Sequence, residues 1–147
     1  MLKDVIITMQ TIQNCDDAEE ASTLNFSTDG LYSFDDSVGC LTYEESEVTG
    51  MEGTRTSVFV MPDKVVVDRD GSVTSRMEFK PGEKTSFLYN TPFGSATMGI
   101  STRKLSQSFG AQGGRAEIEY VIDVEHRVFT KNKFIINVEQ AGGRTNA

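Results

Sequence analysis

The chain has 147 residues, of which 37% are hydrophobic, with nine Phe and no Trp. This length and composition suit one domain with one core. The formal net charge is −8 and the sequence pI is about 4.6. Since Lys and Arg form no run, the basic patch that nucleic acid or an anionic membrane requires is missing, and we expect neither as a partner.

The N-terminus and the two cysteines bear on the cellular compartment. Residues 1–10 place a charged pair before an apolar run that is too short for a signal peptide, and no stretch nears the ~20 apolar residues of a spanning helix. We therefore expect a cytoplasmic protein. Cys15 and Cys40 have the spacing of neither a zinc site nor a redox motif, so two free thiols are expected, with a disulfide between them as the less favoured alternative.

Ten segments of the chain are predicted as β-strands, because each is apolar or alternating and ends at a turn sequence. In chain order they are Val5–Asn14, Ser22–Phe34, Gly39–Val48, Thr54–Met61, Val65–Arg69, Val73–Lys80, Thr85–Thr91, Ser95–Phe109, Ala116–Val124 and Val128–Val138. No long window has helical periodicity. The acidic break Cys15–Glu20 is too short for more than one helical turn.

Turn signals separate these segments at short intervals. Asp70–Gly71 predicts a two-residue hairpin, Pro81–Gly82 suits a type II turn, and the glycine-rich residues 110–114 predict another reversal. Within the long segment 95–109 the apolar parity changes between Ile100 and Leu105. That change predicts a β-bulge or a sharp bend.

Ten consecutive antiparallel strands joined by short turns predict an up-and-down sheet. An open sheet would expose the apolar edges Val5–Met9 and Phe134–Val138, and pairing the first strand with the last would remove both. We therefore predict a closed antiparallel up-and-down β-barrel of roughly eight to ten strands, with some segments as bent continuations of others. It forms a single domain over residues 1–140, followed by a flexible tail over 141–147.

Alternation along each strand predicts which side chains point into the barrel, and the direction of the strand predicts which end of the barrel each one lies near. Toward the end that carries the Gly50–Gly53 loop they are mostly polar, and toward the other end mostly apolar. Polar groups converging above an apolar floor are typical of a small-molecule pocket. A barrel filled by its own side chains is the alternative. The candidate ligand-binding residues at this mouth are Tyr43, Glu45, Thr54, Thr56, Arg69, Tyr89 and Thr91.

Glu45 and Arg69 form the sharpest pair in this set. Strand alternation points both side chains into the barrel near the same mouth, with one strand between them. Since strands are ≈ 4.8 Å apart, the gap is roughly 10 Å. Two long side chains can bridge this gap over Thr54 or Thr56. We predict a partly buried ion pair, and the alternative is two solvated charges on a wet rim.

No motif predicts catalysis or a cofactor. The single histidine, His126, lies in a predicted turn without a second histidine or a cysteine placed to share a metal, so a solvated turn residue is expected and no metal site. The glutamates around residues 44–52 are expected to form an acidic rim. An enzyme is therefore the least favoured class.

Three segments in order along the chain, Tyr43–Thr56, Ser75–Phe79 and Tyr89–Gly94, resemble the YwiB-like family of uncharacterised bacterial proteins. The resemblance spans nearly the whole domain and implies a lipocalin-like, calycin-type β-barrel. It implies no activity, cofactor or ligand, because none is established for that family.

Two hypotheses on function follow. The leading one is a cytoplasmic, non-catalytic barrel that binds a small, partly apolar or amphipathic ligand in its lumen, which rests in part on analogy with lipocalin-like folds. The alternative is a protein-interaction or structural module whose barrel is filled. A lumen of ~300 Å³ or more would favour the ligand, and a packed interior with an exposed apolar patch would favour a protein partner.

Overall fold

The computed structural model describes residues 2–15, 22–124 and 127–141. The elements are all strands: β1 (Lys3–Cys15), β2 (Ser22–Asp35), β3 (Val38–Glu44), β4 (Thr54–Val60), β5 (Val65–Gly71), β6 (Ser75–Phe79), β7 (Lys84–Thr91), β8 (Gly94–Gly110), β9 (Gly113–Val124) and β10 (Arg127–Gln140). The predicted all-β class and strand number are confirmed. Each predicted segment is a strand of its own, so the expectation that some continue others is wrong. Over the described ranges, no helix has the length and apolar character needed to cross a membrane.

The strands form one antiparallel sheet in the order β6-β5-β4-β3-β2-β1-β10-β9-β8-β7. The predicted pairing of the first strand with the last is present, from Val5 opposite Gln140 to Cys15 opposite Thr130. This pairing places β1 and β10 in the middle of the sheet. Neither apolar segment is left as an exposed edge, which is what the closure argument requires.

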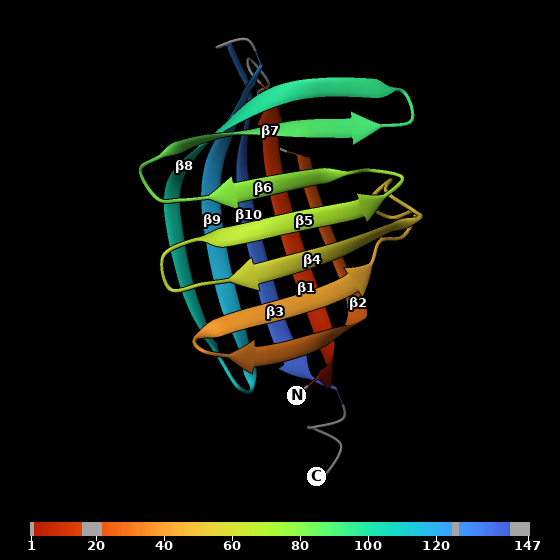
Figure 1. The fold of residues 1–147 in the computed structure, drawn as a ribbon, viewed down its shortest axis with the longest axis vertical. Helices are drawn as coiled ribbons and strands as arrows, with labels where there is room; N and C mark the ends of the chain where they lie inside the picture. The colour runs from red at the N-terminus through yellow and green to blue at the C-terminus, as the bar shows by residue number, and fades with distance from the viewer. Residues whose placement is uncertain (1, 16–21, 125–126, 142–147) are drawn as a thin grey trace.

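The barrel is nearly closed, with a seam between β6 and β7 (Figure 1). Thr74 and Asn90 exchange two backbone hydrogen bonds across the seam, of 2.9 and 3.0 Å. The predicted Pro81–Gly82 turn forms, with a bond of 3.0 Å from the Glu83 amide to the Lys80 carbonyl. However, Gly82 and Glu83 also bond to the backbone of Thr102 on β8. This anchors the turn to β8, and β7 pairs along β8 and not along β6.

Two long strands bend and thereby join two crossing layers, with β3–β6 running at a steep angle over β1, β9 and β10 (Figure 1). β2 pairs with β1 along its first part and with β3 along its last. β8 passes similarly from β7 to β9, and its register shifts between Thr102 and Lys104. This irregularity confirms the predicted bulge, and bends of this kind make the corners of orthogonal sheet packings.

Gly30 lies at the bend of β2, where the pairing passes from β1 to β3. A Cβ atom there would lie 2.5 Å from Ile7 Cδ1 and 2.7 Å from the Thr42 carbonyl oxygen. Only a residue without a side chain lets the two layers approach this closely. The close approach of the layers therefore explains why a glycine occupies position 30, which the sequence pattern alone does not reveal.

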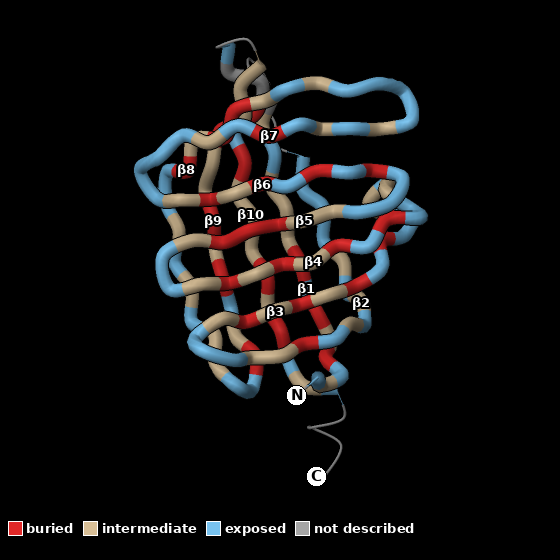
Figure 2. Tube along the Cα trace, viewed as in Figure 1, coloured by how far each residue is buried: buried red, intermediate tan, exposed pale blue. Residues whose placement is uncertain are grey.

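Alternation along the strands separates a buried inner face from an outer face, as the bands of Figure 2 show. In β4, for example, Thr54, Thr56, Val58 and Val60 are buried and the residues between them are not. The buried polar residues are Glu45, Thr54, Thr56, Ser75, Thr102, Thr130 and Asn132. Three of them, Glu45, Thr54 and Thr56, belong to the predicted polar mouth. Glu47 is exposed, because β3 ends at Glu44 and a turn follows.

The predicted two-residue hairpin at Asp70–Gly71 can be compared with the structure. Asp70 and Gly71 do not form the predicted hairpin turn, because they continue β5 and pair with Arg55 and Thr54. Gly71 has a φ of 145°, and a Cβ there would clash with the carbonyl oxygen of Gly53, so glycine permits this close approach.

Other expectations fall on residues that the structure does not describe. His126 and the tail after residue 141 lie outside the described residues, as does the side chain of Cys15. The redox state of Cys15 and Cys40 therefore stays a prediction. Cys40 itself is half-buried on β3.

Candidate functional site

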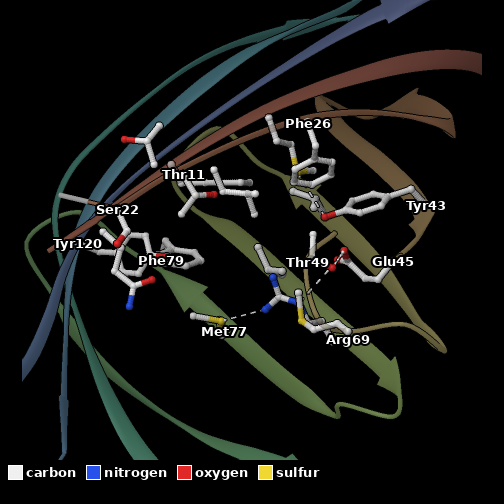
Figure 3. A pocket seen from close by; sticks show the side chains of 18 residues that line it. Thr11, Ser22, Phe26, Tyr43, Glu45, Thr49, Arg69, Met77, Phe79 and Tyr120 are labelled. Atoms are coloured by element: carbon white, nitrogen blue, oxygen red, sulfur yellow. Dashed lines mark hydrogen bonds and ion pairs between the residues drawn. The ribbon is translucent and has the colours of Figure 1, made fainter. Parts of the chain in front are cut away.

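A cavity of about 310 Å³ lies inside the barrel (Figure 3). Its apolar wall is formed by aromatic, valine and methionine side chains from both layers: Met9, Phe26, Val58, Val67, Met77, Phe79 and Phe134. Liquid water occupies ≈ 30 Å³ per molecule, so the cavity has room for a ligand of on the order of ten non-hydrogen atoms. Toward the surface the lining includes Ser22, Thr23 and Leu24, which are exposed.

Glu45 holds one polar corner of this cavity. It follows the end of β3, and its backbone amide bonds to the Thr54 carbonyl at 2.8 Å. Its side chain is only 1% exposed. One carboxylate oxygen accepts a hydrogen bond of 2.5 Å from the Thr56 hydroxyl, and the other accepts one of 2.9 Å from the Thr49 hydroxyl. These two hydroxyl bonds partly compensate the burial of the carboxylate.

Arg69 lies on β5, where its backbone is opposite Thr56 on β4 and Ser75 on β6. Its Nε lies 3.9 Å from the nearer oxygen of Glu45, so the predicted ion pair is present and bridges over Thr56. This distance is too long for a hydrogen bond. Nε is buried and has no hydrogen-bond partner among the described residues, while Nη1 donates to the Met77 sulfur at 3.5 Å. The guanidinium therefore keeps donor capacity beside the cavity.

Two tyrosine residues also line the cavity, Tyr43 and Tyr120. The Tyr43 hydroxyl donates to the Met9 sulfur at 3.4 Å. Burial, and next the negative charge of Glu45, raise the pKa of Tyr43 well above its usual value of 10. Burial also raises the pKa of Tyr120, whose ring packs edge-on against Phe79 with centroids 4.8 Å apart. Both hydroxyls are therefore protonated at neutral pH and can donate hydrogen bonds.

The structure brings together only part of the predicted mouth. Tyr43, Glu45 and Arg69 line the cavity. Thr54 and Thr56 are fully buried behind it, where Thr56 bonds to Glu45 and Thr54 accepts a bond of 3.1 Å from the Val73 amide. Tyr89 and Thr91 do not line it, because they lie on β7 beyond the seam.

Sequence reasoning missed several lining residues. Thr49 and Met51 come from the β3–β4 loop, whose path no strand pattern predicts. Ser22–Leu24 come from the start of β2, an exposed stretch with no apolar signal. Phe26, on β2, was also not predicted as a lining residue.

The described residues contain no candidate metal cluster. In the ranges 2–15, 22–124 and 127–141, no group of three or more His, Cys, Asp or Glu side chains could hold a metal ion. Gly110 and Gly113 pair with each other at the β8–β9 reversal, so the glycine-rich stretch is a turn, as predicted.

Comparison with known proteins places this barrel in a family. A family model described as a domain of unknown function, DUF1934, matches residues 7–136. The chain belongs to the DUF1934 family. The crystal structure of YwiB from Bacillus subtilis superimposes on this DUF1934 chain with a TM-score of 0.83 at 22% sequence identity, covering 95% of this chain and 93% of YwiB. None of the curated proteins compared with the chain matches it.

These matches confirm the YwiB-like resemblance found from the sequence. At 22% identity the likeness to YwiB shows the fold alone. For DUF1934 the family description gives no function, so any activity has to be argued from the cavity itself.

Proposed function

We propose that this DUF1934 protein is a non-catalytic, cytoplasmic protein that binds a small, partly apolar molecule in its barrel. The observation that supports the proposal is the cavity of about 310 Å³ with apolar walls and one polar corner. Protein interiors are close-packed, and voids larger than a water molecule are few. The volume is at the lower end of the ~300–1,000 Å³ typical of ligand sites.

The composition of the wall supports the same proposal. Met9, Met51 and Met77 all line the cavity, and methionine side chains adapt to the shape of a bound molecule. The polar lining includes the corner of Glu45 and Arg69, where Thr49 bonds to Glu45, and in addition the hydroxyl and amide side chains of Thr11, Gln13, Ser22 and Thr23. Polar groups set in an apolar wall can fix the orientation of a ligand. An enzyme would need reacting groups in addition. The described lining residues include one hydroxyl that donates to a carboxylate, Thr49 to Glu45 at 2.9 Å, and neither a histidine nor a cysteine.

The alternative of a filled interaction module has less support. Its strongest observation is Phe93, which is 99% exposed at the β7–β8 reversal, together with Leu88 at 55% on β7. Singly exposed apolar side chains are common on soluble proteins and do not by themselves mark an interface.

A bulkier side chain in the cavity should separate the two hypotheses. Val67 is 5% exposed and lines the cavity, so Val67→Phe is expected to occupy part of the space and to compete with the ligand for it. Native mass spectrometry of the wild-type protein purified from its own host should show an additional mass that denaturing conditions remove. The Val67→Phe variant should lack this mass, and its free energy of unfolding should fall by less than about 1 kcal/mol.

Leu88→Phe, which adds a ring on the exposed part of β7, is the matched control and should keep the additional mass. If Val67→Phe instead lost about 1–3 kcal/mol of stability, the barrel would be packed, and the proposal would fail. An additional mass retained by Val67→Phe would place the bound molecule elsewhere on the protein.

A further inference from the structure

The polar corner of the cavity offers hydrogen-bond donors more than acceptors. Arg69 Nε is buried without a partner among the described residues, and Nη1 has only a sulfur, which is a weak acceptor. In contrast, each carboxylate oxygen of Glu45 already accepts a hydroxyl bond. The Arg69 side chain is 19% exposed and that of Glu45 only 1%. A ligand therefore meets the exposed part of the Arg69 side chain, whose one hydrogen bond within the described residues is the weak one from Nη1 to sulfur.

The second feature of this corner is its charge balance. Glu45 and Arg69 are the only charged residues among the described residues that line the cavity, and they form an ion pair at 3.9 Å. A ligand carboxylate would add a second negative charge beside Glu45 in a poorly solvated space. A ligand ammonium would add a second positive charge beside Arg69. Both are unfavourable because charges interact strongly where water is scarce.

Tyr43 provides a second donor on the same side of the cavity (Figure 3). Its hydroxyl now donates to the Met9 sulfur at 3.4 Å. A carbonyl oxygen is a better acceptor than a thioether and could take this bond. The cavity thus presents two donors, Arg69 and Tyr43, beside a balanced ion pair.

From these observations we propose that the ligand is a neutral amphiphile whose polar end is a hydrogen-bond acceptor, such as a ketone or ester carbonyl, bound by Arg69. Its apolar part packs on the wall formed by Phe26, Phe79 and Phe134. This inference rests on the proposed function. It adds the chemical class of the ligand, of on the order of ten non-hydrogen atoms.

Three probes of similar size test the ligand class. 2-Nonanone carries a neutral acceptor, octanoate a negative charge and octylammonium a positive charge. Isothermal titration calorimetry at neutral pH should show that the wild-type protein binds 2-nonanone about tenfold or more tightly than either ion.

Glu45→Gln tests the charge argument, because it removes the negative charge and keeps a carbonyl oxygen that can accept from one of the two threonines, while its amide NH2 can donate to the hydroxyl oxygen of the other. The ratio of affinities should then shift toward octanoate by about tenfold or more. Glu47→Gln, an exposed change on the same loop with the same effect on net charge, should leave the ratio unchanged. The double variant Glu45→Gln/Arg69→Met leaves no unpaired charge in the cavity and should bind 2-nonanone about tenfold more weakly than the wild type.

The outcomes separate this inference from the proposal on which it rests. If none of the three probes binds the wild-type protein, the proposed function itself fails. If probes bind but octanoate or octylammonium matches 2-nonanone, the neutral-ligand class is wrong while the binding function stands. An unchanged ratio in a folded Glu45→Gln variant, checked by its thermal melting curve, would also overturn the inference. If that variant does not fold, the wild-type ranking and the double variant decide.

Discussion

Replacement of Ile7 by Ala is expected to lower the free energy of unfolding by about 2–5 kcal/mol. Ile7 is fully buried on β1, where it lies opposite Thr28 of β2 and Val138 of β10. Its Cδ1 atom fills the space beside Gly30 at the corner of the barrel. The truncation removes apolar contacts at the strand pairing that closes the sheet and leaves a void there. Urea unfolding followed by far-UV circular dichroism measures the loss.

Ile6→Ala is the matched control, because the same atoms are removed one residue away on the opposite face of β1. Ile6 is only half-buried, so the expected loss is well below that of Ile7→Ala. Equal losses at the two positions would contradict the assignment of the β1 faces, and with it the inner surface of the barrel.

Arg69→Ala is expected to destabilise the fold by about 1–3 kcal/mol, because the buried carboxylate of Glu45 loses its counter-charge. Glu45 would keep its bonds from Thr49 and Thr56, so the effect is smaller than that of leaving a carboxylate with no partner at all. A double-mutant cycle with Glu45→Gln isolates the interaction between the two side chains.

The exposed pair Glu44–Arg55 is the control for this cycle. Its atoms are closer, at 2.6 Å, yet both side chains are 66% exposed. Solvent screening should make its coupling small in spite of the shorter distance. Coupling between Glu45 and Arg69 that does not exceed that of Glu44 and Arg55 would mean that burial adds nothing to the interior pair.

Local patterns were sufficient to predict most of the fold. Alternation in β3 and β4 identified the inner face, and the parity change between Ile100 and Leu105 located the bulge of β8. The apolar character of β1 and β10 predicted their pairing, since two such edges cannot both stay exposed. The same parity placed Glu45 and Arg69 close enough to form their ion pair.

The remaining features depend on contacts between residues far apart in the sequence. Tyr89 and Thr91 were expected at the mouth, but the backbone bonds of Thr102 to Gly82 and Glu83 direct β7 toward β8 and away from β6. Hairpin rules that consider only the Pro81–Gly82 turn contain no information about such bonds. Likewise, Thr49 and Met51 line the cavity from the β3–β4 loop. Because a loop has no residue periodicity, the sequence pattern does not predict which of its side chains face the cavity.

The most direct test of a ligand-binding cavity is a titration of the protein, labelled with ¹³C at its methionine methyl groups, with 2-nonanone followed by NMR. Met9, Met51 and Met77 line the cavity, whereas Met61 and Met98 do not. Saturable shifts at the methyl groups of Met9 and Met77, with little change at Met61 and Met98, are the predicted result. No shift at any of them, or equal shifts at all of them, would contradict binding in this cavity.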